Sequence, residues 1–192
     1  FLRVLTSGQA AGRYALMHFP GQRAYVLGNP MLLAELARIG VAIDCERPDY
    51  VLIGYDTTLT YEKLTQVCDF VRAGLPYIAT HPDFNCPTET GFAPDIGAMI
   101  AFIRASTGRA PDVVIGKPNE GIVREALAVT GLSAGELAMV GDRLYTDIAT
   151  GLNFGMTSIL VLTGEATLAD VQTSEFKPDL VFERLSAMIE YL

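Results

Sequence analysis

The chain has 192 residues, of which 50% are hydrophobic and 19% are charged, so it can bury one large core or two smaller ones. This composition excludes a disordered chain. Fourteen Lys and Arg residues against 22 Asp and Glu residues give a net charge of −8 without a basic run, which argues against nucleic acid as a partner. An anionic ligand would need a local counter-charge, such as a metal ion or a single lysine.

The three cysteines have no C-x-x-C spacing and therefore predict neither a disulfide framework nor a zinc site. Such cysteines are typical of free thiols in a reducing compartment. No apolar run approaches the ~20 residues of a membrane span. The first residues, Phe1 to Leu5, have neither an initiator Met nor a signal-peptide pattern. We expect a cytoplasmic protein without a membrane partner, whose sequence here is incomplete at its front.

Seven short runs are apolar throughout, as strands covered on both faces should be. They lie at 24–27, 50–53, 77–79, 113–115, 137–140, 158–162 and 180–182. Between them, apolar stripes at helical spacing predict helices that end at glycine stop signals. These helices are expected at 31–39, 61–73, 96–106 and 120–130. The alternation indicates an α/β fold with a parallel sheet and right-handed crossovers.

Two shorter segments are predicted from their local chemistry. Thr6 and Ser7 are expected to cap a helix that leads into the remainder of the chain. The segment 80–94 holds three prolines and one glycine and shows no period, which predicts a loop. A loop of this length is usually functional.

A lysine follows one buried strand in the motif Ile115 to Asn119. Open α/β sheets bind ligands at the carboxyl ends of their strands, where Lys117 would lie. Pro118 ends the strand, and Asn119 or Glu120 can open the next helix. The ammonium could neutralise a phosphate or a carboxylate. Taken alone, however, the pattern fits an ordinary loop lysine better.

Carboxylates follow the next buried strand in the segment 140–147. Gly141 allows tight backbone geometry, and Asp142 would point into the same crevice as the lysine. Hard oxygen ligands at a strand end suit Mg²⁺, which keeps water or phosphate oxygens at its other positions. We favour a metal role for Asp142, whereas Asp147 fits a structural role as well as a ligand role. Together with Lys117, these acids predict a metal-assisted phosphoryl site.

The segments GKPNEGI and GDRLYTDIATGLNFGMTSILVLTGEAT resemble the third and fourth motifs of the haloacid dehalogenase (HAD) superfamily. AYVLGNPMLLAELARIGVAI, DYVLIGYDTTLTYEKLTQ and KPDLVFERLSAMIEYL extend the likeness to the NagD-like, p-nitrophenyl-phosphatase-type branch, from about Val4 to the C-terminus. The resemblance implies a Rossmann-like HAD core, incomplete here, with an inserted α/β cap. Residues 1–19 would end the N-terminal core and form a linker helix, 20–111 would be the cap, and 112–192 the C-terminal part of the core.

The resemblance also implies residue roles. Lys117 matches the lysine that neutralises the phosphate and the aspartyl-phosphate intermediate. Asp142 matches the aspartate that binds Mg²⁺, and Asp147 matches the second acid, which more often supports the site by hydrogen bonds. Asn119 matches a supporting position near the rim of the active site.

The cap loop from Thr80 to Asp95 would choose the substrate, with Asn85 and Asp95 as candidate contacts. A carboxylate at Asp95 would favour hydroxyl-rich or cationic leaving groups, so a sugar phosphate fits better than an acid. Asp95 fits the N-cap of the helix starting at Ile96 at least as well. Caps in this branch often pair, which makes a homodimer through the cap an expectation.

One departure from the family is serious, because the chain contains no D-x-D motif, whose first aspartate is the family's nucleophile. We expect that the N-terminal core segment with this motif lies upstream, and that the 192 residues alone are unstable and inactive. The predicted function is a Mg²⁺-dependent phosphatase of small phosphorylated metabolites, above all sugar phosphates, and of aryl phosphates such as p-nitrophenyl phosphate. The alternative is a truncated or degenerate homologue that acts as a binding or scaffold module. A receiver-like phosphoacceptor domain is a third reading, but it leaves the cap-length insertion unexplained.

Overall fold

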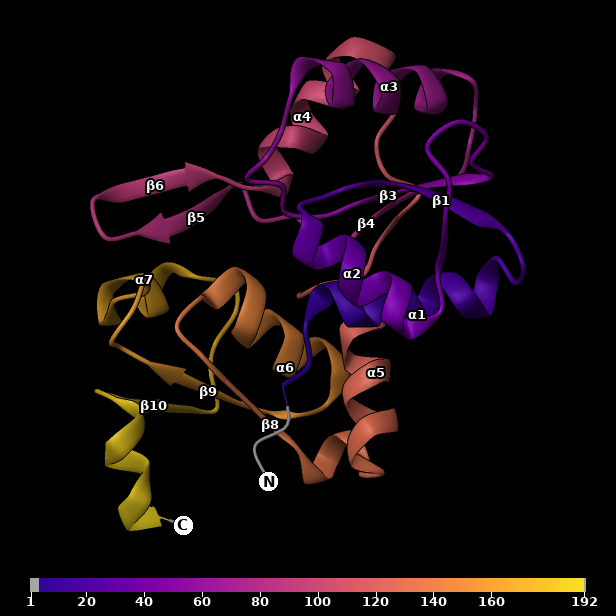
Figure 1. Cartoon of the computed structure of the whole chain (residues 1–192). Coiled ribbons are helices and arrows are strands. Elements are labelled where there is room, and N and C mark those ends of the chain that lie inside the picture. The colour runs from indigo at the N-terminus through magenta and orange to yellow at the C-terminus, as the bar shows by residue number, and fades with distance from the viewer. Residues whose placement is uncertain (1–3, 192) are drawn as a thin grey trace. The chain divides into compact units, whose positions relative to one another are not determined.

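A computed structural model describes residues 4–191 of the chain (Figure 1). The chain divides into two compact units, residues 1–116 and residues 117–192, each with its own parallel sheet. Among residues 4–191, no helix is long and apolar enough to cross a membrane.

The first unit is built on a five-stranded sheet in which every pairing is parallel. The strand order is β2-β1-β3-β4-β7. The strands are β1 (Arg23–Leu27), β2 (Ala42–Ile43), β3 (Tyr50–Ile53), β4 (Tyr77–Ala79) and β7 (Val113–Val114). The predicted parallel sheet is therefore present, and only the two-residue strand β2 was not anticipated.

Two pairs of helices cover this sheet. α1 (Ser7–His18) packs against α2 (Pro30–Ile39), and α3 (Tyr61–Arg72) packs against α4 (Ile96–Thr107). Figure 1 shows the two pairs on opposite faces of the sheet. The core beneath α3 and α4 is formed by buried side chains that the strands and helices share; they include Tyr25, Val51, Tyr77, Val67, Ile96 and Ile103. Because both faces are covered, the strands are apolar except for exposed Arg23 at the start of β1.

Local capping chemistry sets the helix starts. The hydroxyl of Thr6 accepts a hydrogen bond from the backbone N–H of Gln9, and the side chain of Gln9 accepts one from the backbone N–H of Thr6. This capping box confirms the predicted cap of the first helix. The side chains of Asn29, Thr60 and Asp95 each accept one backbone N–H group at the start of α2, α3 and α4, respectively.

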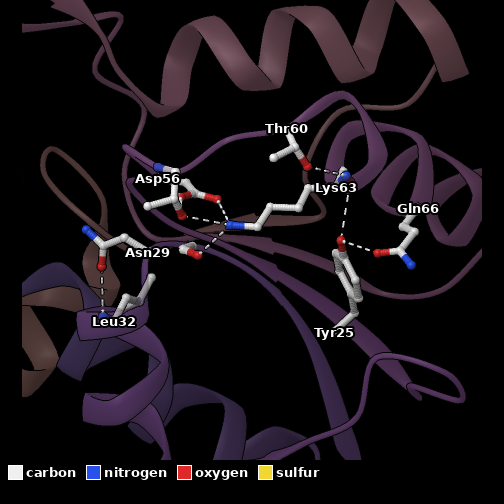
Figure 2. Close-up of polar contacts among 9 residues, drawn as sticks. Tyr25, Asn29, Leu32, Asp56, Thr60, Lys63 and Gln66 are labelled. Atoms are coloured by element: carbon white, nitrogen blue, oxygen red, sulfur yellow. Dashed lines mark hydrogen bonds and ion pairs between the residues drawn. The ribbon is translucent and has the colours of Figure 1, made fainter.

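A buried acid and a partly exposed lysine, Asp56 and Lys63, join the loop after β3 to α3 (Figure 2). One carboxylate oxygen of Asp56 accepts hydrogen bonds from the backbone N–H and the hydroxyl of Thr58, and the other lies 2.7 Å from the ammonium of Lys63. That ammonium also donates to the Thr58 hydroxyl at 2.9 Å and to the carbonyl of Gly28, which follows β1, at 3.4 Å. Both carboxylate oxygens of Asp56 and the ammonium of Lys63 thus have hydrogen-bond partners within the protein. The pair links the loops after β1 and β3 to each other.

Tyr25 makes further polar contacts with α3, next to this pair. Its hydroxyl contacts the carbonyl of Lys63 and the side-chain oxygen of Gln66, both at 3.2 Å (Figure 2). Burial raises the pKa of Tyr25 to about 12, so the phenol stays a neutral donor at physiological pH.

The segment 80–94 corrects one prediction, because most of it is a β-hairpin. β5 (Asn85–Thr88) pairs antiparallel with β6 (Gly91–Pro94). Both strands carry proline and are largely exposed, so they lack the buried apolar face by which strands are recognised. The positive φ of Gly91 closes the turn between them.

The second unit has a three-stranded parallel sheet in the order β10-β9-β8. Its strands are β8 (Ala138–Gly141), β9 (Thr157–Val161) and β10 (Leu180–Phe182). Its helices are α5 (Glu120–Thr130), α6 (Ala149–Phe154) and α7 (Leu168–Thr173), with 3-10 turns at Ala134–Glu136 and Leu185–Tyr191. A π-helical turn, Leu144–Ile148, runs directly into α6. The buried core centres on Leu144, Ile148, Leu160 and Ala166.

The two units meet in sequence after Gly116, a few residues beyond the boundary predicted at 111. The reason is that β7 pairs with β4, so Val113 and Val114 belong to the sheet of the first unit. The functional division into cap and core stays a prediction.

Candidate active site

Lys117 is the first residue of the second unit and precedes α5. The Lys117–Pro118 peptide bond is cis. Asn119 is the N-cap residue of α5, in an extended conformation, and its side chain does not make the capping hydrogen bond. The side chain of Lys117 is 43% exposed, and its ammonium is paired with the carboxylate of Asp147. One side of the cation is thus held by an acid while the other faces solvent.

Asp147 lies on the π-helical turn and is buried. One of its carboxylate oxygens binds Lys117, and the other accepts a hydrogen bond from the backbone N–H of Arg143 at 3.2 Å. Both oxygens are therefore engaged by the protein. A buried carboxylate is stable only when it is paired and hydrogen-bonded, and the lysine supplies that pairing.

Gly141, the last residue of β8, makes this placement of Asp147 possible. A Cβ atom at Gly141 would collide with the carboxyl group of Asp147. The glycine is thus needed for close approach, as the strand-end motif predicted.

Asp142 follows Gly141 and is partly buried. One of its carboxylate oxygens accepts a hydrogen bond from the backbone N–H of Glu165 at 2.9 Å, and its carbonyl accepts one from Ala166 at 3.0 Å. A Cβ atom at Gly164 would collide with the same carboxylate. The loop after β9 therefore orients Asp142 through a second close glycine contact.

The donor set near Asp142 bears on a metal ion. Within residues 4–191, the second carboxylate oxygen of Asp142 makes no hydrogen bond, so it can accept a hard cation. The same part of the chain holds no cluster of three Asp, Glu, His or Cys side chains. Mg²⁺ is usually bound by one or two carboxylates and keeps water or phosphate at its other positions. The residues present fit a magnesium ion as one part of its coordination sphere.

The structure thus brings Lys117, Asp147 and the Asp142 loop together, as the paired motifs predicted. Gly164 and the backbone of Glu165 were missed. Their signal was available, because they follow the apolar run 158–162 and lie at the carboxyl end of β9.

The two candidate substrate contacts belong to the first unit. Asn85 begins the exposed strand β5. Asp95 is buried, and one of its carboxylate oxygens accepts the backbone N–H of Ile96 at 2.7 Å and lies 3.1 Å from Nε2 of His81. Asp95 therefore caps α4, which is the alternative to substrate contact that the sequence offered.

The site combines a lysine, a buried acid that holds it and a second acid with a carboxylate oxygen open to a cation. These are groups that phosphoryl chemistry uses. A HAD-hydrolase-like family model matches residues 114–188. The acid sugar phosphatase of Staphylococcus aureus is 42% identical over 190 residues, which cover 98% of this chain and 73% of that protein. The crystal structure of a 4-nitrophenylphosphatase from Thermotoga maritima matches with a TM-score of 0.93 and 47% identity, covering 97% of this chain and 72% of that one.

A glycerol phosphate phosphatase from Mycobacterium tuberculosis, solved in complex with calcium, matches with a TM-score of 0.89 and 33% identity over 96% of this chain and 56% of that one. The chain belongs to the HAD superfamily, in its NagD-like, p-nitrophenyl-phosphatase-type branch. It is therefore a phosphatase of the HAD type, and the expected α/β fold class is confirmed.

Proposed function

We propose that the protein is a Mg²⁺-dependent phosphomonoesterase that acts on small phosphorylated metabolites, with sugar phosphates as the preferred class and aryl phosphates as further substrates. The observation that carries the proposal is the ammonium of Lys117, held by buried Asp147 beside the loop that presents Asp142. The names of the relatives support the substrate classes, since one is an acid sugar phosphatase and another a 4-nitrophenylphosphatase.

In this proposal, Lys117 is the catalytic cation. Its ammonium neutralises the phosphate oxygens, whose charge rises as the ester bond breaks. Asp147 keeps the ammonium in place, because a flexible four-carbon side chain that is 43% exposed would otherwise sample many rotamers. Asp147 is thus a supporting residue, since both of its oxygens already have protein partners.

Asp142 is proposed as the residue that holds the metal ion, which would supply positive charge to the phosphate when bound. The backbone N–H of Glu165 fixes one carboxylate oxygen and directs the other away from it. Asn119 has a supporting role at the start of α5. The calcium in the M. tuberculosis relative supports a divalent cation in this branch.

An aspartyl-phosphate route needs a nucleophilic carboxylate, and neither Asp142 nor Asp147 is suited to it. Asp147 is paired with Lys117, and Asp142 is the residue proposed to hold the metal ion. Because the 192 residues contain no D-x-D motif, we propose that the nucleophile comes from residues outside them.

Residues 20–111 are proposed to act as the cap that selects the substrate, with Asn85 and the segment around Asp95 in that role, and residues 112–192 as the C-terminal part of the core. A homodimer through the cap is part of the same proposal. Its support is the exposure of two aromatic side chains beside and on the hairpin, Phe84 at 61% and Phe92 at 74%.

Phosphate release by the protein encoded by the complete gene tests the proposal. Sugar, nucleotide and aryl phosphates are assayed with and without Mg²⁺, for the wild type and for Asp142→Asn. We expect Mg²⁺-dependent release that is highest with sugar phosphates, and a variant whose residual release no longer responds to Mg²⁺. Wild-type release that is unchanged by chelation, or an Asp142→Asn variant that keeps full magnesium dependence, would overturn it.

A further inference from the structure

A serine, a histidine and an aspartate of the first unit form a line of hydrogen bonds. Ser7 is the first residue of α1, His81 follows β4, and Asp95 caps α4. The Ser7 hydroxyl lies 3.2 Å from Nδ1 of His81, and Nε2 of the same ring lies 3.1 Å from the carboxylate of Asp95. A nucleophile, its general base and the group that orients the base have this arrangement in hydrolases that use a serine.

The aspartate decides which ring nitrogen of His81 can act as a base. A carboxylate only accepts hydrogen bonds, so Nε2 carries the ring proton and donates it to Asp95. In the neutral imidazole, Nδ1 then has the free lone pair and accepts from the hydroxyls of Ser7 and, at 3.3 Å, Thr80. The side chains of His81 and Asp95 are only 18% and 10% exposed, so packing holds the ring in this orientation. The lone pair is therefore directed at the Ser7 hydroxyl.

A pocket of about 350 Å³ gives access to this hydroxyl. Both Ser7 and His81 line the pocket. Its volume lies at the small end of the range for small-molecule sites, roughly 300–1,000 Å³. A hydrogen bond that only stabilises the fold needs no such opening, whereas a nucleophile must be reached by its substrate.

A backbone donor lies beside the serine. Gly8 lines the same pocket, and within residues 4–191 its N–H makes no hydrogen bond. It is the second residue of α1, where N–H groups have no partner inside the helix and favour negative charge. In α/β-hydrolases, the N–H of the residue after the nucleophilic serine stabilises the oxyanion. Gly8 has this position relative to Ser7.

The other residues of the pocket select the acyl group. Met31, Leu32 and Tyr55 offer apolar surface against which C–H groups can pack. The described lining contains one carboxylate, Glu35, and neither lysine nor arginine. The partners of Glu35 among residues 4–191 are uncharged, so an anionic group would meet this acid without a compensating cation. The pocket thus suits a short, uncharged acyl group.

We propose that Ser7, His81 and Asp95 form a second hydrolytic centre, which cleaves esters of short, uncharged carboxylic acids. Oγ of Ser7 attacks the carbonyl carbon while its proton passes to Nδ1 of His81, and the N–H of Gly8 stabilises the oxyanion. The C–O bond to the alcohol then breaks, and His81 returns the proton to the departing oxygen. Water attacks the acyl-serine with His81 again as the base, which releases the acid and regenerates Ser7.

Hydrolysis of p-nitrophenyl acetate by the protein encoded by the complete gene tests the proposal, because this ester contains no phosphate. We expect saturable turnover, roughly tenfold faster than that of the mono-p-nitrophenyl ester of succinic acid, whose free carboxylate would meet Glu35. Ser7→Ala and His81→Asn should each lower kcat/KM about 100-fold or more. His18→Asn is the matched control, because the exposed His18 stacks on Tyr14 and is the other histidine of the sequence.

Covalent labelling locates the nucleophile. An alkyl fluorophosphonate reacts with activated serines, and the adduct is mapped by mass spectrometry of tryptic peptides. We expect it in peptide 4–13, where Ser7 is the only serine, and we expect none in His81→Asn. Lys117→Ala should keep the adduct while losing phosphate release, which separates a failure of this proposal from a failure of the proposed function.

Asp95 acts through the histidine and is therefore a positioning residue. Asp95→Asn should lower kcat for p-nitrophenyl acetate about tenfold or more and leave KM unchanged, because Asp95 fixes the ring proton without contacting the ester. A purely structural role would instead reduce the folded fraction and leave kcat per folded molecule unchanged.

Two results would overturn the proposal. One is turnover of p-nitrophenyl acetate that Ser7→Ala retains in full. The other is the absence of a fluorophosphonate adduct at Ser7 in the folded wild type. Equal rates with the acetate and succinate esters would overturn the assigned substrate class.

Discussion

Each unit carries a lysine and an aspartate in contact near the carboxyl ends of its parallel strands, yet the two pairs differ in what remains available. In the first unit, the side chain of Asp56 is fully buried and both oxygens have partners, while the Lys63 ammonium has three (Figure 2). In the second unit, the ammonium of Lys117 has one partner among residues 4–191, and the side chain of Lys117 is 43% exposed.

The difference teaches that the residue pair itself does not define a site. A pair whose polar atoms all have partners within the protein offers no hydrogen bond to a ligand and instead links two loops. In a pair where the acid contacts only one side of the ammonium, the exposed side of the ammonium can still interact with a phosphate. The exposure and the number of partners thus agree with a stabilising role for Lys63 and with the catalytic role that we propose for Lys117.

The largest effect on phosphate release is expected when either of two glycines near the acids of the second unit is replaced by alanine. Gly141→Ala would push against the carboxyl group of Asp147, and Gly164→Ala against that of Asp142. Displacing either acid misaligns the charges that stabilise the transition state, so we expect phosphate release to fall about 10²–10³-fold for each variant. Gly135→Ala is the matched control, because a Cβ there would meet no atom within 4 Å. Release from either variant at the level of Gly135→Ala would contradict the close-approach role of these glycines.

Asp56→Asn should remove the ion pair with Lys63 and lower the free energy of unfolding. Because the charge-assisted hydrogen bond to the partly exposed Lys63 ammonium is lost, we expect a loss of about 2 kcal/mol, measured by urea denaturation. Activity per folded molecule should stay unchanged. A drop in activity without a change in stability would place Asp56 in the chemistry instead.

The same variant has a defined pH dependence. Burial pushes the pKa of Asp56 upward, but hydrogen bonds from Lys63 and Thr58 outweigh it, so the pKa lies below its usual value. A depressed folded-state pKa stabilises the protein above the unfolded-state pKa, about 3.9, and this contribution is lost as the pH falls toward the folded-state value. The stability difference between the wild type and Asp56→Asn should therefore be constant from pH 5 to 7 and shrink below about pH 4. A difference that grows on acidification would contradict the assignment.

Asp147→Asn should have a smaller effect on activity than the glycine variants. Asparagine has nearly the same shape and still accepts a hydrogen bond, but it removes the negative charge that holds Lys117. We expect kcat to fall about tenfold, equivalent to ~1.4 kcal/mol, with the magnesium dependence intact. Loss of that dependence would instead make Asp147 a metal ligand.

The smallest effect is expected at Tyr77, whose buried hydroxyl has no hydrogen-bond partner in the described part of the chain, residues 4–191. Burial raises the pKa of this phenol far above its usual value, so it remains neutral. Tyr77→Phe removes an unsatisfied polar group without leaving a cavity, and the protein should be as stable as the wild type or up to about 1 kcal/mol more stable. A loss of more than 1 kcal/mol in urea denaturation would show that the hydroxyl is satisfied in solution.

The sequence was informative where burial left few alternatives. All seven apolar runs became strands within two residues of the predicted bounds, because strands covered on both faces must be apolar throughout. Lys117, Gly141 and Asp142 were found for the same reason, since each stands at the end of such a run. The hairpin of β5 and β6 was missed because it is exposed and interrupted by proline.

The remaining features depend on tertiary contacts that no local pattern encodes. Gly164 is near Asp142 only because β9 pairs with β8. Likewise, Ser7, His81 and Asp95 are far apart in sequence and meet through the packing of α1, the loop after β4 and α4. Asp56 and Asp147 also differ because the fold brings different hydrogen-bond donors to each carboxylate.

A parallel measurement of Lys117→Ala and Lys63→Ala tests the central claim most directly, with magnesium-dependent phosphate release and urea denaturation recorded for both proteins. We predict that Lys117→Ala loses at least 100-fold in release with little change in unfolding free energy, and that Lys63→Ala loses stability while its folded fraction retains activity. Equal activity losses in the two variants, or full activity of Lys117→Ala, would contradict the account.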